Sequence, residues 1–267
     1  MVEKFIEKPA ALAYSGGLDS RYLAKTLCAA GCDLLLVHAT GDHIAPRDTL
    51  YAQTFAQKNK LPMLSFLFDP LHIEGIDTKE RCYVCKKALF QTMRAILEKH
   101  GESGRILIDG TNRDDHAVFR PGLRALAEEN IVSPLDLAGL GKEAIRAKAR
   151  AMHLDDPEQK PSPCLLTRLA YGLRADAQTL KRIAEAESTL AQALTSALGF
   201  EPALRLRLTP SPLLQVECEE ESLLSQQDRV RAILDQFAFL PAKLLAEQMI
   251  SGFFDREGQT KAAVVLT

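Results

Sequence analysis

Strand-length apolar runs alternate with helix-length segments through the first half of the chain, and this alternation constrains the fold more than any other feature. Five segments have the composition of buried strands: Ala10–Tyr14, Leu34–Thr40, Leu61–Phe68, Arg105–Asp109 and 131–135. Helical patterns follow them at Leu18–Ala30, Arg47–Lys60, Lys79–His100, Asp115–Glu129 and 142–152. Short strands separated by helices are typical of a parallel sheet with helices on both faces. The sequence therefore predicts an α/β fold, whose ligands bind at the carboxyl ends of the strands.

The second half of the chain predicts a smaller α/β domain. The segment from His153 to Cys164 is polar and contains three prolines, which is typical of a loop or linker. Beyond it we expect a long helix at Ala175–Leu198, a strand pair within 203–208 and 213–218, and a helix at 220–237. Residues 261–267 are either a strand or a tail. We expect three regions: a first domain at 1–154, a linker loop at 155–174 and a small second domain at 175–267.

Composition narrows the classes of partner. The chain has 267 residues, of which 46% are hydrophobic, so it can bury a proper core. Its formal net charge of −2 favours neither nucleic acid nor a membrane surface as the main partner. No apolar run reaches membrane-spanning length, and the first ten residues lack an apolar targeting region. We expect a cytoplasmic protein, whose cysteines are reduced. We also expect the protein to form a homo-oligomer.

The loop Ser15–Ser20, with the sequence SGGLDS, is the strongest local signal. It joins a predicted strand to a predicted helix, so its backbone N–H groups lie at the positive end of the helix dipole. Glycines let an anion approach the backbone closely, and the two serine hydroxyls add donors. The loop is not a Walker loop, because no lysine closes it. The alternative is a polar turn that binds no ligand.

SGGLDS resembles the S-G-G-x-D-S pyrophosphate loop of the N-type ATP pyrophosphatases (the PP-loop superfamily), which split ATP between its α and β phosphates. The resemblance implies that the first domain binds ATP with Mg²⁺. It assigns the pyrophosphate to Ser15, Gly16, Gly17 and Ser20, and places Asp19 near the magnesium, which prefers hard oxygen ligands.

Two further segments suit a nucleotide site at the strand ends. His38 and Thr40 end the second predicted strand, where the superfamily seats ATP. Gly110, Thr111 and Asn112 follow the fourth strand within the run Asp109–Asp115. An Asx-rich helix cap would explain that run without a ligand. Its polar side chains also suit ATP and metal.

The remaining motifs are similar to one subgroup, the ATP-dependent sulfur transferases of nickel-pincer cofactor synthesis (the LarE family). These motifs are DGTNRDDHAVFRPGLRAL, SPL, GKEAIRAKAR and PSPCLLTRLAYG. In the last of them Cys164, Arg168, Tyr171 and Gly172 fall on family positions. The resemblance implies a small nucleotide-like substrate, a pyridinium dicarboxylate mononucleotide. Its carboxylate is adenylated and then converted to a thiocarboxylate.

Cysteines are the candidate source of sulfur. Cys164 lies in the proline-rich loop beside Arg168, which would lower a thiol pKa, and we take it with Asp19 as catalytic. Cys82 and Cys85 form a CxxC pair at the start of a predicted helix. Some members of the family hold a 4Fe-4S cluster with three such cysteines, whereas in other members a single cysteine gives up its own sulfur. A CxxC pair can also be a redox pair or half of a zinc site, although zinc normally needs four protein ligands and only Cys164 could join the pair. We favour the cluster; a pair of free thiols is the alternative without a function. Cys28, Cys32 and Cys218 are interpreted as small core residues.

Arginines in the second domain are candidates for a substrate phosphate. Arg205 and Arg207 alternate along a predicted strand, so they share one face, and the family has a similar R-x-R strand. Arg168 is assigned to the same site. The alternative is a solvated strand face. Glu187 is a weaker match to a family acid, and the last thirty residues depart from the family pattern, which puts the substrate in doubt.

Other functions stay open. A tRNA thiolase also combines this loop with three cysteines and a cluster, but it needs a strongly basic surface. Amidating synthetases need an ammonia source, and no glutaminase domain fits in the chain. A catalytically inactive ATP-binding module is the third alternative.

Overall fold

The computed structural model describes residues 8–117, 121–248, 250, 252–255 and 263–267. The chain divides into two compact units, Met1–Ser162 and Pro163–Thr267. Each unit has its own sheet and is described separately. The division falls within the predicted linker at 155–174, and the scheme of two domains joined by a linker stays a prediction.

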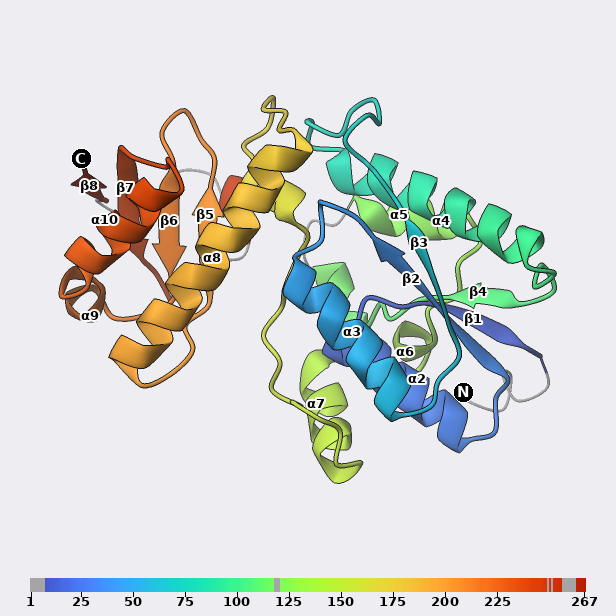
Figure 1. Ribbon diagram of the computed structural model, residues 1–267. Helices are drawn as coiled ribbons and strands as arrows, with labels where there is room; N and C mark the ends of the chain where they lie inside the picture. Colours follow the sequence, from blue (N-terminus) through green and yellow to red (C-terminus); the bar gives the residue numbers. More distant parts are fainter. Residues whose placement is uncertain (1–7, 118–120, 249, 251, 256–262) are drawn as a thin grey trace. The chain divides into compact units, whose positions relative to one another are not determined.

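The first unit is built on a parallel sheet. Its strands are β1 (Ala10–Ala13), β2 (Leu34–Thr40), β3 (Met63–Leu67) and β4 (Ile106–Ile108). They lie in the order β3-β2-β1-β4, and every pair is parallel (Figure 1). The predicted α/β fold class is therefore confirmed.

Helices cover both faces of this sheet, because alternate strand residues enter two separate cores. Leu12 and Leu36 pack with α2 (Leu18–Ala29), α3 (Pro46–Lys58) and α7 (Lys142–Ala151). Ala11 and Val37 point to the opposite face. There they pack with α4 (Arg81–Lys99) and α5 (Gly122–Glu128). Figure 1 shows these two helix layers.

Two predicted elements of this unit differ from the structure. The predicted strand at 131–135 contributes only one parallel bridge, between Val132 and Ile108. Pro134 has no N–H to continue a ladder, and it instead begins the short helix α6 (Pro134–Leu137). The helix predicted at Asp115–Glu129 is a 3-10 turn, η1 (Arg113–Ala117), followed by α5; residues 118–120 lie outside the described ranges.

The second unit contains a mixed sheet in the order β5-β6-β7-β8. The predicted pair is confirmed as antiparallel β5 (Leu204–Arg207) and β6 (Leu213–Val216). Strand β7 (Ala242–Ala246), which pairs parallel with β6, was not predicted from the sequence. At the C-terminus β8 (Val264–Leu266) pairs with β7, so the strand alternative for this segment is confirmed.

Helices of the second unit mostly follow the predicted pattern. Helix α8 (Ala177–Leu198) begins at Asp176, whose carboxylate accepts a hydrogen bond of 2.7 Å from the Thr179 N–H. The helix predicted at 220–237 is interrupted, and forms α9 (Glu220–Leu224) and α10 (Gln227–Gln236). Short 3-10 turns lie at η2 (Leu165–Arg168) and η3 (Phe253–Asp255).

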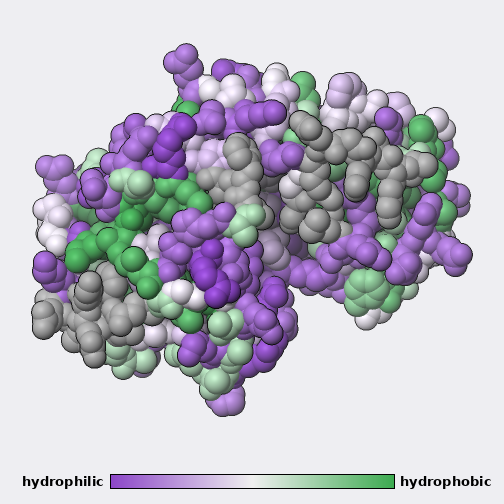
Figure 2. Space-filling model, turned by 180° about the vertical axis from the view of Figure 1, so that it is seen from behind, coloured by the Kyte–Doolittle hydropathy of each residue, from purple (hydrophilic) through white to green (hydrophobic). Residues whose placement is uncertain are grey.

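The surface is largely hydrophilic on the face shown in Figure 2, where hydrophobic side chains gather in one area at the left. Large hydrophobic side chains are exposed at separate places in both units: Leu50, Leu67, Leu137, Leu173, Phe200 and Val265. Within the described ranges, no helix combines the length and the apolar character needed to cross a membrane.

Candidate active site

The strand order of the first unit identifies where a ligand should bind. From β1 the chain passes to β2 and β3 on one side, and then returns to β4 on the other side of β1. Such a reversal leaves a crevice outside the carboxyl ends of the two strands, which is where open α/β sheets bind ligands. The segments that leave β1 and β4 are the predicted phosphate loop and the run Asp109–Asp115.

The phosphate loop has the geometry of an anion site. Gly16 has a φ of +80°, and a Cβ there would lie 2.6 Å from the Ala52 Cβ, so only glycine fits. Gly17 caps α2, and its N–H donates to the Ser15 Oγ at 3.2 Å. The Ser20 hydroxyl donates to the Gly17 carbonyl at 2.9 Å. The glycines, the hydroxyls and the start of α2 therefore meet in one tight turn.

A hydrogen bond joins this loop to the end of β4. The Asn112 Nδ2 donates to the Asp19 Oδ2 at 2.9 Å. Asn112 is fully buried and is itself held, because its Oδ1 accepts from the Asp114 N–H at 3.0 Å and its N–H donates to Asp115 at 3.2 Å. The Asp19 carboxylate thus has a fixed orientation on the first turn of a helix. A fixed carboxylate beside an anion loop suits a hard cation such as Mg²⁺.

Asp109 organises the turn after β4 rather than facing solvent. Its carboxylate accepts hydrogen bonds from the Thr111 N–H at 3.1 Å, the Thr111 hydroxyl at 2.5 Å and the Ser133 hydroxyl at 2.6 Å. Both Asp109 and Thr111 are buried. The Asx-rich helix cap stays the alternative to a ligand for this run. The Asp109 carboxylate and the Thr111 N–H form an Asx-type turn. It also holds Asn112 against Asp19.

Gly110 lets the two segments approach each other. A Cβ at this position would lie 3.1 Å from the Ser20 backbone N and 3.3 Å from its Cα. Such contacts are tighter than most Cβ atoms make, so a side chain at this position would require the backbone of α2 to shift. The structure therefore brings together Ser15, Gly16, Gly17, Asp19 and Ser20 with Gly110 and Asn112.

His38 and Thr40 lie at the end of β2, beside this group. The His38 imidazole is 1% exposed, and its Nδ1 donates to the Tyr14 carbonyl at 2.8 Å, which leaves Nε2 as an acceptor. Burial lowers the pKa of His38, which favours the neutral form of the ring. The Thr40 hydroxyl donates to the Phe66 carbonyl at 3.1 Å. A role for either residue in ATP binding stays a prediction.

The three predicted cluster cysteines lie in different units. Cys82 and Cys85 occupy the first two turns of α4, three residues apart, so they share one face of the helix; Cys82 is exposed and Cys85 half-buried. Cys164 belongs to the second unit, where it precedes η2. Among the described residues, no three or more His, Cys, Asp or Glu side chains form a group that could hold a metal ion. Convergence of the three sulfurs stays a prediction.

The three predicted phosphate-binding arginines are buried in the second unit. Arg168, Arg205 and Arg207 are each 5% exposed or less, so the solvated-face alternative for β5 is wrong. Arg168 forms a bidentate ion pair with Glu187, with both N–O distances at 2.9 Å. Glu187 also accepts from the Leu206 N–H at 2.7 Å, which ties η2, α8 and β5 together.

Arg207 and Arg205 share an acceptor, the Ile250 carbonyl. Arg207 also donates to the Gln215 Oε1 and the Thr167 carbonyl, both at 2.7 Å. Burial and the neighbouring Arg168 charge lower the pKa of Arg205 to about 10. A bound anion would offset that unfavourable charge. Binding of phosphate would, however, have to compete with the protein acceptors that these guanidinium groups already have.

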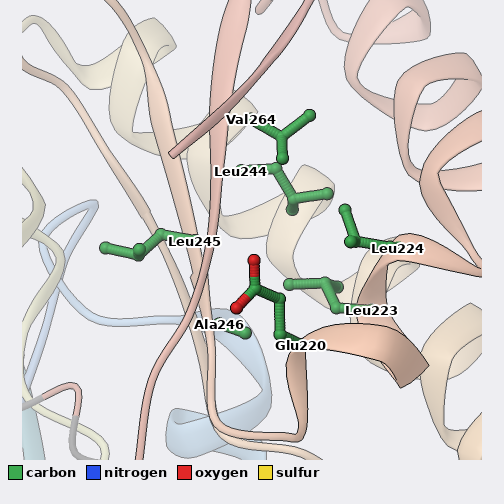
Figure 3. Close-up of a pocket in the computed structure, with 7 residues that line it drawn as sticks. All are labelled: Glu220, Leu223, Leu224, Leu244, Leu245, Ala246 and Val264. Atoms are coloured by element: carbon green, nitrogen blue, oxygen red, sulfur yellow. The ribbon is translucent and has the colours of Figure 1, made fainter. Parts of the chain in front are cut away.

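Figure 3 shows a small pocket in the second unit. It has a volume of about 260 Å³ and is lined by Glu220, Leu223, Leu224, Leu244, Leu245, Ala246 and Val264. Its walls are mostly leucine, and none of its lining residues is a predicted site residue.

Two residues that contact the candidate site were not predicted from the sequence. Ser133 supplies a hydroxyl to Asp109, and the available signal was its place in the SPL motif. Arg21 is fully buried directly after the phosphate loop. A cation in the first turn of a helix is unfavourable because of the helix dipole. This unfavourable position was the sequence signal that could have identified Arg21.

Comparison with known proteins places the chain in a family. No protein-family model matches the chain. An uncharacterized protein of Synechocystis, slr1717, is 30% identical over 183 residues, which cover 67% of this chain and 67% of that protein. The chain belongs to the same family as slr1717.

Two further relatives cover more of the chain. An uncharacterized protein of Methanocaldococcus jannaschii, MJ0830, is 29% identical over 237 residues, or 89% of each protein. The pyridinium-3,5-bisthiocarboxylic acid mononucleotide synthase of Lactiplantibacillus plantarum is 26% identical over 236 residues, or 85% of this chain and 82% of that enzyme. This similarity supports the PP-loop superfamily that SGGLDS resembles, and it suggests an enzyme that adenylates its substrate and transfers sulfur.

Proposed function

We propose that the protein is an ATP-dependent sulfur transferase that acts on a pyridinium dicarboxylate mononucleotide. It would adenylate a carboxylate of this substrate, release pyrophosphate and insert sulfur to give a thiocarboxylate. The reaction would serve nickel-pincer nucleotide synthesis. The observation that carries the proposal is the phosphate loop at the β1–β4 crevice, with Asp19 fixed by Asn112. The similarity to the mononucleotide synthase supports the substrate class.

The two half-reactions balance without a redox step. The substrate carboxylate oxygen would attack the α-phosphorus of ATP, the bond from this phosphorus to the oxygen that bridges to the β-phosphorus would break, and pyrophosphate would leave. A sulfur nucleophile then attacks the carbonyl carbon, and AMP leaves. A free carboxylate is a poor electrophile, and adenylation supplies the leaving group that it lacks.

Residues of the first unit suit the adenylation step. Ser15, Gly16, Gly17 and Ser20 would bind the departing pyrophosphate through backbone N–H groups and hydroxyls at the start of α2. Asp19 would bind Mg²⁺, and its hydrogen bond from Asn112 would hold the carboxylate in one orientation. His38, Thr40, Gly110 and Thr111 line the same strand ends and would contribute to the nucleotide site.

Sulfur delivery is assigned to cysteine. We propose Cys82, Cys85 and Cys164 as ligands of a 4Fe-4S cluster that, when bound, would supply the sulfide. The placement of Cys82 and Cys85 on one helix face supports two of the three ligands. In the alternative, Cys164 gives up its own sulfur. Both routes need reduced thiols, which favours a cytoplasmic setting.

The second unit would hold the substrate phosphate. Arg205, Arg207 and Arg168 provide a buried positive region, and guanidinium groups bind phosphate through paired donors. The lowered pKa of Arg205 supports an anion there. The aromatic rings of Phe253 and Phe254, both 5.5 Å from the Arg207 guanidinium, border the same region.

Pyrophosphate release tests the proposed function. The protein, purified under anaerobic conditions, is incubated with Mg²⁺-ATP and a pyridinium-3,5-dicarboxylate mononucleotide, and pyrophosphate and AMP are measured. We expect release that depends on the mononucleotide. Asp19→Asn should reduce turnover by about 100-fold or more, the usual scale for removing one group that stabilises the transition state. The matched control, Asp235→Asn, changes an exposed carboxylate of the second unit and should keep full activity.

Two results would count against the proposal. Normal turnover by Asp19→Asn would contradict the assignment of Ser15–Ser20 as the pyrophosphate-binding loop. Pyrophosphate release that needs ammonia rather than sulfide would instead indicate an amidating synthetase.

A further inference from the structure

Arg21 is a buried cation at a place that disfavours one. It lies in the first turn of α2 and is 0% exposed. The positive end of the helix dipole repels a cation there, and burial of a charge without partners is costly. The contacts around Arg21 must offset both the repulsion by the helix dipole and the cost of burying the charge. They connect two segments that are far apart in the sequence.

On one side Arg21 binds the phosphate loop. Its Nε donates to the Gly16 carbonyl at 3.0 Å. The carbonyl and the following N–H of a trans peptide point in opposite directions, so this bond directs the Gly17 N–H away from Arg21. The Ser20 hydroxyl holds the Gly17 carbonyl in the same way, at 2.9 Å. Both carbonyl oxygens, which would repel a phosphate, are thereby occupied.

On the other side Arg21 binds the segment Asp155–Gln159. Its Nη1 donates to the Asp155 carbonyl at 2.5 Å, and its Nη2 donates to the Asp156 carbonyl at 3.1 Å and to the Gln159 Oε1 at 3.0 Å. The guanidinium also lies over the Tyr51 ring at 5.0 Å and the Phe55 ring at 5.4 Å. The planar fork is therefore fixed in one orientation by aromatic side chains of α3.

We propose that Arg21 is a positioning residue that couples occupancy of the phosphate loop to the order of Asp155–Gln159. This segment ends five residues before Cys164 in the sequence. When phosphate binds the backbone N–H groups of the loop, Gly16 is held in its present conformation. The Arg21 guanidinium, which is bonded to Gly16, then holds the segment Asp155–Gln159. The inference rests on the proposed function, because it takes ATP as the ligand of the loop.

Hydrogen exchange of the full-length protein tests the coupling. Backbone amides of residues 155–160 are followed by mass spectrometry with and without saturating Mg²⁺-ATP, and ATP affinity is measured on the same samples. In the unmodified protein we expect ATP to slow exchange in this segment by about tenfold, the scale of one charged hydrogen bond. Arg21→Lys keeps the positive charge but lacks the several N–H donors of the guanidinium. It should reduce the ATP-dependent slowing of exchange to less than about threefold.

Two further variants separate coupling from simple destabilisation. Gln159→Leu removes a single acceptor of Arg21 outside the core and should also reduce the ATP-dependent slowing, even if Arg21→Lys fails to fold. Lys58→Ala is the matched control, because it removes a 2.7 Å ion pair to Asp155 without touching the loop. It should speed exchange equally with and without ATP.

The outcomes distinguish the inference from the proposed function. ATP binding without slowed exchange at 155–160 overturns the coupling alone. Equal slowing in Gln159→Leu and in the unmodified protein also overturns it. Failure to bind ATP at all overturns the proposed function together with the coupling.

Discussion

His43 is a buried imidazole whose protonation opposes folding. It follows β2, is 5% exposed, and lies 5.7 Å from the Phe68 ring, edge to face. Burial lowers its pKa to about 4, although the charges of Asp69 and Asp42 act in the opposite direction. Its Nδ1 is buried without a hydrogen-bond partner, so no hydrogen bond at that atom offsets the burial of the imidazolium charge.

The stability of the protein should therefore fall on acidification. Between about pH 6.5 and about pH 4 the unfolded chain binds a proton at His43 and the folded chain does not. The stabilisation is complete above pH 6.5 and should decrease by about 2–4 kcal/mol by pH 4. Urea unfolding at pH 7 and pH 4.5 measures this loss. His43→Gln should lose less stability over that interval, whereas His72→Gln, which changes a side chain that is 91% exposed, should behave like the unmodified protein.

At the scale of elements, the turn after β4 and the start of α2 are in close contact. Gly110→Ala should push the new Cβ against the Ser20 backbone, which lies 3.1 Å away, and displace the phosphate loop. We expect pyrophosphate release to fall by about tenfold or more, since small misplacements of reacting groups have large effects on rate. Gly104→Ala is the control, because no atom lies within 4 Å of its Cβ position. Equal activity of the two variants would contradict this account.

Periodicity predicted the buried strands of the first unit and missed two features of the sheets. The observed bounds of β2 match the predicted strand Leu34–Thr40, because its two faces are buried and its first four residues form a continuous apolar run. The strand predicted at 131–135 fails, since a single bridge at Val132 is all that precedes Pro134. Strand β7 was overlooked because Ala242–Ala246 is short and includes an exposed lysine, Lys243. Its place in the sheet comes from pairing with β6, which is distant in sequence.

At the scale of the whole molecule, the proposed 4Fe-4S cluster would have Cys82, Cys85 and Cys164 as its ligands. If a cluster forms, protein purified without oxygen should contain about four iron atoms per chain. Cys82→Ser, Cys85→Ser or Cys164→Ser should each lower the iron content, whereas the control Cys218→Ser should leave it unchanged. Burial raises the pKa of the Cys218 thiol, which is the behaviour of a small core residue.

Mass spectrometry after turnover separates the two sulfur sources. A cluster enzyme keeps Cys164 intact through repeated cycles. A sacrificial cysteine loses about 34 Da at that position, the mass of hydrogen sulfide, when the thiol becomes dehydroalanine. That loss together with an absence of iron would exclude the cluster and retain the sulfur transferase.

The sequence alone determined the α/β class, the turn at Ser15–Ser20 between β1 and α2, and the strand that carries Arg205 and Arg207. Each depends on local pattern: alternating apolar runs, two glycines before a helix, and alternate side chains on a strand. Tertiary structure decided what surrounds them. Asn112 reaches Asp19 across 93 residues of sequence, and Arg21 reaches Gln159 across 138. These pairs exist only because β4 returns beside β1 and the segment after α7 packs on α2. The burial of Arg205 and Arg207 was likewise decided by the fold, since strand alternation fixes a shared face but not what covers it.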